Sequence, residues 1–188
     1  MNKLLQEIKQ CMVCKDHLSP NPVVSISRKS KIIIVGQAPG RIVHETGIPW
    51  NDKSGDRLRD WLGIDKTTFY DTDKIGIMPM GFCYPGKGPG GDLPPRHECA
   101  IHWHEKILKL TIAPKLMILV GHYAQKYYLK DRSHSTITEN IRNYLEFLPQ
   151  FFVLPHPSPR NNIWMKKNQW FEQKVVPHLK NFVSGIIS

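Results

Sequence analysis

The sequence predicts an α/β protein, a three-layer αβα fold with a central, mainly parallel four-stranded sheet. Short apolar runs that are largely β-branched or aromatic are typical of strands buried on both faces. Four such runs occur, at 31–35, 75–80, 115–120 and 151–154. Helix-like segments alternate with them, at about 54–63, 95–112, 122–130, 136–147 and 165–183. Strands and helices that alternate in this way form βαβ units, in which neighbouring strands run parallel.

Each predicted strand is followed by a loop rich in glycine or proline. The loops are GQAPG at 36–40, GFCYPG at 81–86, Gly121-His122, and PHPSP at 155–159. The second run also contains Pro79, which cannot donate a ladder hydrogen bond, so that strand should end or bulge there. Because the carboxyl ends of parallel strands share one edge, where ligands bind, loops from distant parts of the chain should meet at that edge.

The composition is that of one globular domain covering residues 1–188. Hydrophobic residues make up 40% of the chain and charged residues 22%, and no apolar run approaches the roughly 20 residues that a membrane span requires. The first residues lack the apolar stretch and cleavage site of a secretory signal, which predicts a cytoplasmic location. An excess of basic residues gives a net charge of +10. This charge favours nucleic acid as a partner, or else only keeps a basic protein soluble.

The four cysteines form a close pair, Cys11 and Cys14, and a distant pair, Cys83 and Cys99. Without a secretory signal, structural disulfides are not expected. Four thiolates suit either a structural zinc or an iron-sulfur cluster, and the number of ligands does not separate these two. Zinc sites usually contain two close pairs, whereas here the second pair spans a loop rich in glycine and proline. Four free thiols are the remaining alternative.

Two motifs together resemble the signatures of the uracil-DNA glycosylase superfamily. One is GQAPG after the first predicted strand, and the other is HPSPRN at 156–161 after the last. Between them, the segment 41–62 resembles the superfamily stretch in which an aromatic residue after Gly-x-Pro forms one wall of the base pocket. The resemblance covers about residues 11–161. It implies the uracil-DNA glycosylase-like fold and a monofunctional DNA glycosylase that flips uracil, or another deaminated or modified base, out of DNA and excises it.

The cysteine spacing resembles that of the superfamily branch with a 4Fe-4S cluster, the family-four-like branch. The ligands of that branch match Cys11, Cys14, Cys83 and Cys99. The resemblance therefore implies a 4Fe-4S cluster of mainly structural function, with structural zinc as the alternative. The HPSPRN motif is closer to the single-strand-selective branch, so the chain resembles a divergent subfamily that mixes features of both.

Base excision requires a group that stabilises the leaving base and groups that hold it outside the stack. His156 is the first candidate for the leaving base, because an imidazole can donate a hydrogen bond to a developing oxyanion, and its match in the superfamily has that role. Gln37 is the second catalytic candidate, since its amide can hold the base edge or a water. The backbone at Gly36, Ala38 and Gly40 is expected to approach the base closely. Trp50 offers a flat face on which the base can stack.

The expected partner is DNA, single- or double-stranded, bound by a monomer that makes no membrane contact. Ser54 and Ser158 can donate hydrogen bonds to phosphates. Arg160 follows the HPSP turn and is expected to enter a groove or fill the gap left by the flipped base. Lys87 is a weaker candidate for phosphate contact.

The positions expected to activate water depart from the family pattern. The residue that matches Ala38 is an aspartate in the best-known branch, and the acidic pair of the iron-sulfur branch matches Val43 and His44. We therefore expect His44 or Glu45 to orient the water or to stabilise positive charge on the sugar, with Asp92 as an outside candidate.

Base specificity is also open. The superfamily often reads uracil with an asparagine at the end of the second strand, where this chain has Met78 and Pro79. Neither can make the paired hydrogen bonds that distinguish uracil from cytosine. Hypoxanthine or a hydroxymethyl base is then a second substrate class. A nucleic-acid-binding relative without catalytic activity is the competing functional hypothesis.

Overall fold

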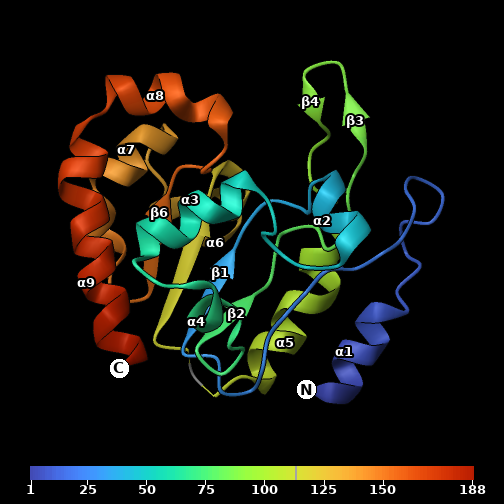
Figure 1. Cartoon of the computed structure of the whole chain (residues 1–188). Coiled ribbons are helices and arrows are strands. Elements are labelled where there is room, and N and C mark those ends of the chain that lie inside the picture. Colours follow the sequence, from blue (N-terminus) through green and yellow to red (C-terminus); the bar gives the residue numbers. More distant parts are fainter. Residues whose placement is uncertain (113) are drawn as a thin grey trace.

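The computed structural model describes residues 1–112 and 114–188 and is built around one parallel sheet (Figure 1). The strand order is β2-β1-β5-β6, and every neighbouring pair is parallel. The strands are β1 (Ile32–Val35), β2 (Ile75–Ile77), β5 (Leu116–Val120) and β6 (Phe151–Leu154). The prediction of an α/β fold with a four-stranded parallel sheet is therefore confirmed.

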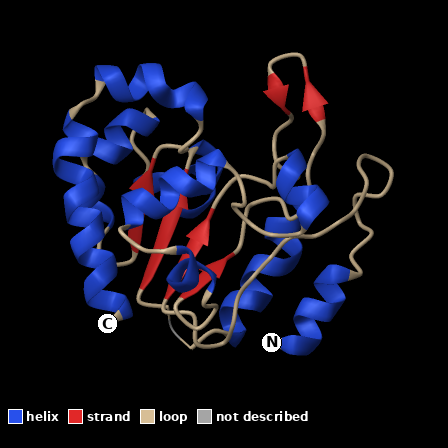
Figure 2. Ribbon diagram, viewed as in Figure 1, coloured by secondary structure: helices blue, strands red, loops and turns tan. Residues whose placement is uncertain are grey.

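The strands are apolar because helices cover the sheet on both sides (Figure 2). Every residue of the four strands is buried. The register places Ile34 beside Ile77 on one side and beside Ile118 on the other. A strand in this position has no solvent face, so its sequence has no polar alternation.

The helices lie in two groups. On one side, α3 (Lys53–Leu62) packs against α9 (Val176–Ile187). On the other, the π-helical turn Ala100–His104, which continues into α5 (Glu105–Leu110), contacts α6 (His122–Leu129) through His104 and Tyr128. The remaining helices are α1 (Asn2–Lys9), α2 (Arg41–Thr46), α4 (Lys66–Tyr70), α7 (Ile137–Arg142), α8 (Asn162–Lys167), the 3-10 turns Lys130–Arg132, Tyr144–Phe147 and Pro159–Asn161, and the π-helical turn Phe171–Val175.

Several boundaries differ from the sequence-based prediction. The helix expected from residue 95 begins only at 98, because Pro94 and Pro95 lie in a segment without regular secondary structure. The segment expected as one helix over 136–147 is α7 followed by a separate 3-10 turn. The last predicted helix is two helices, because α8 ends at Lys167 before the π-helical turn starts. Strand β2 ends at Ile77, two residues before Pro79.

Four short elements were not predicted: α1, α2, α4 and a hairpin of β3 (Lys87–Gly88) with β4 (Gly91–Asp92). They carry few buried residues; α2, for example, buries only Val43, so the sequence shows no clear apolar period there. The hairpin projects from the body of the molecule beside α2 (Figure 1). Among the described residues, no helix has the length and apolar character needed to cross a membrane.

Candidate active site

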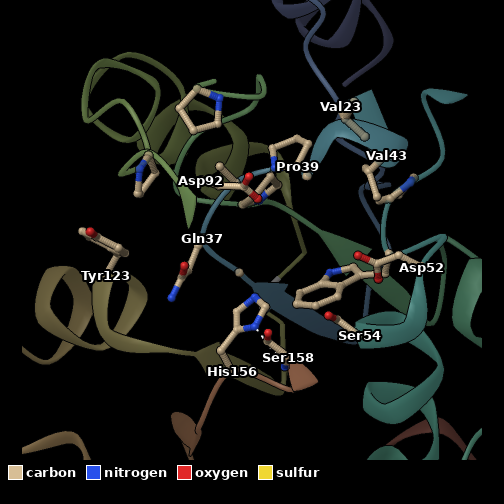
Figure 3. A pocket seen from close by; sticks show the side chains of 18 of the residues that line it. Val23, Gln37, Pro39, Val43, Asp52, Ser54, Asp92, Tyr123, His156 and Ser158 are labelled. Carbon is tan, nitrogen blue, oxygen red and sulfur yellow. Dashed lines mark hydrogen bonds between the residues drawn. The ribbon is translucent and has the colours of Figure 1, made fainter. Parts of the chain in front are cut away.

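A cavity of about 490 Å³ opens at the carboxyl ends of the strands, and the two motif loops line it together. Gly36 to Gly40 come from the loop after β1, and His156, Ser158, Arg160 and Asn161 come from the loop after β6. In Figure 3, Gln37 and Tyr123 lie across the cavity from Asp52 and Ser54, with His156 and Ser158 between them. The prediction that these distant loops meet at one edge of the sheet is confirmed.

The first motif loop is fixed by backbone hydrogen bonds that extend the pairing of β1 with the chain after β2. Met80 N–H donates to the carbonyl of Gly36 at 2.9 Å, and Gly81 N–H donates to the carbonyl of Gln37 at 2.8 Å. The side chain of Gln37 lies against Gly121, where an added Cβ would be 2.7 Å from its Nε2. The loop therefore holds Gln37 at the cavity wall without strain in its own backbone.

Trp50 has an unusual backbone, with a positive φ of 56° in a residue that is not glycine. Two contacts hold it there. The buried guanidinium of Arg59 donates to the carbonyl of Trp50 at 3.2 Å, and Gly55 lies so close to that carbonyl that an added Cβ would be 1.7 Å from its oxygen. The indole also packs on Gly36, where a Cβ would meet Cζ2 at 2.8 Å. Strain of this kind persists only where the surroundings enforce it, so the wall residue is rigidly placed.

His156 lies beside this wall. The ring centroids of His156 and Trp50 are 5.7 Å apart, and the two ring planes are inclined by 32°. Its Nδ1 accepts a hydrogen bond from the backbone N–H of Ser158 at 3.2 Å, so a neutral imidazole must carry its proton on Nε2. Burial lowers the pKa of His156, and the charge of Asp52 opposes this shift. The imidazole lies between Gln37 and Ser54 in the cavity (Figure 3). It is therefore a neutral hydrogen-bond donor facing the cavity.

The end of the second strand has no side-chain amide in the cavity. Pro79 lines it, but its carbonyl is bonded by Nε2 of His104 at 3.0 Å. Nδ1 of His104 in turn lies 2.7 Å from the hydroxyl of Tyr128, and burial lowers the pKa of His104 to about 4. This neutral, satisfied histidine supports the cavity floor instead of reading a base.

The residues expected to activate water do not line the cavity. His44 and Glu45 lie on α2, outside the lining residues. Nδ1 of His44 is buried and has no hydrogen-bond partner among the residues that the structure describes, and exposed Glu45 pairs with Arg41 at 3.0 Å. Asp92, the outside candidate, does line the cavity and accepts a hydrogen bond from the hydroxyl of Tyr84 at 3.1 Å.

Three further polar lining residues were not singled out from the sequence: Asp52, Tyr123 and Asn161. Asn161 donates to the carbonyl of His156 at 2.7 Å and so steadies the second motif loop. The signal for Asp52 was present, because an aspartate just before a helix-like segment is a typical N-cap. Its side chain accepts a hydrogen bond from Gly55 N–H at 2.8 Å.

The residues expected to contact DNA divide into two sets. Ser54, Ser158 and Arg160 line the cavity, whereas exposed Lys87 lies on β3 outside the lining. Arg160 extends to the hairpin, where its Nη1 donates to the carbonyl of Gly90 at 3.1 Å. Gly91 is needed for this contact, because a Cβ there would be 1.9 Å from the same nitrogen.

The four cysteines line a second, smaller pocket with Arg96 and Trp103. All four are free thiols. The backbone N–H of Phe82 donates to Sγ of Cys99 at 3.4 Å. Burial raises the pKa of Cys83 to about 11 and that of Cys99 to about 12. Over the described residues, no group of three or more His, Cys, Asp or Glu is arranged to hold a metal ion, so the structure brings the cysteines together without showing a metal site.

The fold and the cavity define an α/β protein whose ligand site lies at the carboxyl edge of a parallel sheet. The chain belongs to the uracil-DNA glycosylase superfamily, whose family model matches residues 24–180. It is also 25% identical over 166 residues to the type-4 uracil-DNA glycosylase of Thermotoga maritima, covering 84% of this chain and 81% of that protein. The family resemblance inferred from the two motifs is thus confirmed, and the family implies DNA as the substrate class.

Proposed function

We propose that this protein is a monofunctional DNA glycosylase that hydrolyses the N-glycosidic bond of uracil, or of another deaminated or modified base, after flipping the base out of DNA. The observation that carries the proposal is the cavity of about 490 Å³ in which the neutral His156, the aromatic wall of Trp50 and the GQAPG loop meet. A site in which a flat base can stack beside a hydrogen-bond donor suits base excision.

His156 would stabilise the leaving base. When the C1′–N bond breaks, its electron pair leaves with the base, and negative charge collects on the base carbonyl. The Nε2–H of His156 can donate to that oxygen, because Nδ1 already accepts from Ser158 N–H. A neutral donor gives this stabilisation without transferring its own proton. Water then adds its oxygen to C1′ and releases one proton, which the base takes up.

Gln37 and Trp50 would hold the base. Within the described part of the chain, no hydrogen-bond partner is assigned to the side-chain amide of Gln37, which lines the cavity. A side-chain amide offers both an N–H donor and a C=O acceptor, the pattern needed to pair with a base that carries adjacent C=O and N–H groups. Uracil and hypoxanthine both have that edge. The backbone of Gly36, Ala38 and Gly40 completes the wall on this side.

DNA would be bound by the rim of the cavity. Ser54 and Ser158 can contact phosphates, Arg160 can enter a groove or the gap left by the base, and Lys87 can contact the backbone from the hairpin. The net charge of +10 favours this binding. Water orientation by His44 or Glu45 would require these side chains to act from outside the cavity lining, since neither is part of it. We infer that the enzyme acts as a monomer in the cytoplasm.

For the cofactor, we propose a 4Fe-4S cluster held by Cys11, Cys14, Cys83 and Cys99. The cysteines fit such a group because they line one pocket and because Phe82 N–H already donates to Sγ of Cys99; hydrogen bonds to sulfur are typical of cluster ligands. The cluster would link the N-terminal segment to the loop after β2, and no step of the reaction involves it. Structural zinc is the alternative. Iron and zinc analysis of anaerobically purified protein, with the visible absorption spectrum, distinguishes the two.

The test is incubation with oligonucleotides that each carry one damaged base, followed by alkaline cleavage of abasic sites. We expect strand breaks for at least one deaminated base, and loss of these breaks in His156→Ala. Borohydride should trap no covalent adduct, because no lysine attacks the sugar. Absence of cleavage with every base would contradict the proposal.

The competing function is DNA binding without catalysis, which the alanine at position 38 favours because it cannot orient water. That function predicts salt-dependent DNA binding, no base release, and binding that is little changed by His156→Ala.

A further inference from the structure

We propose that the carboxylate of Asp52 is catalytic and stabilises the positive charge that develops on the sugar as the N-glycosidic bond breaks. This inference rests on the proposed glycosylase activity. The sugar gains oxocarbenium character while the base leaves, so an anion in contact with it lowers the barrier. Neither Ala38 nor the segment of Val43 and His44 supplies that anion.

Only two of the acidic residues in the described chain line the cavity, Asp52 and Asp92. Glu45 is outside it and is paired with Arg41. The candidate anion is therefore either Asp52, at the N-terminus of α3, or Asp92, on the projecting hairpin.

Asp52 is held rigidly. Its side chain caps α3, with one carboxylate oxygen accepting from Gly55 N–H at 2.8 Å. It lies two residues after Trp50, whose carbonyl is fixed by the buried Arg59. No protein donor is assigned to the second carboxylate oxygen among the described residues, which leaves it available to the cavity. A charge on a rigid element stabilises a transition state better than one that must first be ordered.

The order of residues along this segment matches the order of groups in a nucleotide. Trp50, Asp52 and Ser54 all line the cavity. Trp50 forms the wall for the base and Ser54 can donate to a phosphate. The sugar lies between base and phosphate, and Asp52 lies between Trp50 and Ser54. In Figure 3, Asp52 and Ser54 are neighbours on the same wall.

Asp52 is also coupled to the group that faces the leaving base. Its negative charge raises the pKa of His156, against the effect of burial. Both residues line the one cavity that the base and the sugar would occupy.

Asp92 is less suited to this role. It belongs to the two-residue strand β4 of the hairpin and is exposed. One of its oxygens accepts from Tyr84, and the other would lie 3.9 Å from a Cβ added at Gly40 of the first motif. We infer that Asp92 supports the hairpin against the motif loop.

The test compares Asp52→Asn with Asp92→Asn in single-turnover excision of whichever base the wild type releases. Asparagine also caps helices well, so Asp52→Asn removes the charge and keeps α3. We expect excision to fall about 10²-fold or more in Asp52→Asn, as for loss of other transition-state contacts, with DNA affinity equal or slightly higher. Asp92→Asn should change the rate only a few-fold.

A second readout separates catalysis from structure. In Asp52→Asn, the pKa of His156 measured by NMR should be lower than in the wild type, while the midpoint of thermal unfolding is unchanged. Asp52→Ser also keeps a helix cap and should give the same two results. Excision by Asp52→Asn at nearly the wild-type rate, beside an inactive His156→Ala, would overturn the inference and leave the proposed function intact. A wild type that excises no base would overturn both.

Discussion

The cavity and the cysteine pocket both gather residues from distant segments, but they do so by different means. The cavity walls are extensions of the sheet: the loop after β1 continues the backbone pairing with Met80 and Gly81, and Asp52 caps α3. The cysteines lie on irregular chain. Cys11 and Cys14 follow α1, and Cys83 lies in the loop after β2. Only Cys99 stands in a helix, at its beginning.

The difference indicates how each region gains its order. Several cavity groups are positioned by protein contacts, such as His156 by Ser158 N–H and Asp52 by Gly55 N–H, so the cavity is preorganised for a ligand without help. In the cysteine pocket the buried thiols have raised pKa values, and a metal that binds thiolates would release their protons and join the segments. We therefore expect mutations in the two regions to separate activity from stability.

The largest effect should come from Cys99→Ser. If the four cysteines hold a cluster, the variant should lose its iron. Its free energy of unfolding should then fall by more than about 4 kcal/mol, the range typical of a lost metal site. For a chain of this size that corresponds to roughly 8–16 °C in the midpoint of thermal unfolding. Calorimetry and iron analysis measure both quantities.

Iron-stripped wild type is the control for this variant. Removing the metal should lower its midpoint to about that of Cys99→Ser, and the substitution should add little once the metal is gone. Equal stability of stripped and untreated wild type would show that the pocket holds no structural metal.

Trp50→Ala should affect the other region. Stacking on an aromatic ring contributes about 1–3 kcal/mol per base, so single-turnover excision should fall roughly 5- to 150-fold. The indole is only half-buried, and the unfolding midpoint should change little. Trp50→Phe keeps a flat ring and should retain most of the activity. A similar loss in both variants would contradict the assignment of the effect to a flat stacking face.

The same contrast explains how much could be predicted from the sequence. The strands and their edge follow from short apolar runs punctuated by glycine and proline, because a strand buried on both faces has no polar alternation. Gly36 and His156 could be brought together because strand ends share an edge. The convergence of the cysteines on one pocket was expected only through the metal hypothesis.

Other features depend on tertiary contacts that no local pattern encodes. The positive φ of Trp50 is enforced by Arg59 and Gly55, and the contact of Arg160 with Gly90 joins segments far apart in the chain. His44 and Glu45 were placed by alignment to a family pattern, but helix α2 carries them outside the cavity lining.

The pH dependence of excision should follow the titration of His156, which lines the cavity. Burial lowers the pKa of this histidine below its usual 6.5, and the neutral form is the donor we propose. The rate should therefore rise with pH below 6.5 and level off above it. The free energy of unfolding should also rise with pH in this range, because between the folded-state and unfolded-state pKa values of His156 the unfolded state binds more protons. Single-turnover rates from pH 4.5 to 8 test this; a rate that falls as the pH rises would contradict a neutral donor.

The smallest effect should come from Gly91→Ala, which tests whether the hairpin belongs to the preorganised cavity or moves independently. An added Cβ would lie 1.9 Å from Nη1 of Arg160, and the φ of Gly91 is 128°, which disfavours other residues. Gly90→Ala is the matched control, since no atom of the described residues, its own chain neighbours aside, lies within 4 Å of its added Cβ. Strain of about 1 kcal/mol should lower the unfolding midpoint by about 2–4 °C.

If the contact between Arg160 and Gly90 prepares the rim for DNA, affinity for abasic DNA should fall about two- to fivefold in Gly91→Ala and stay constant in Gly90→Ala. Equal affinities, measured by fluorescence anisotropy, would place the hairpin outside the DNA-binding surface.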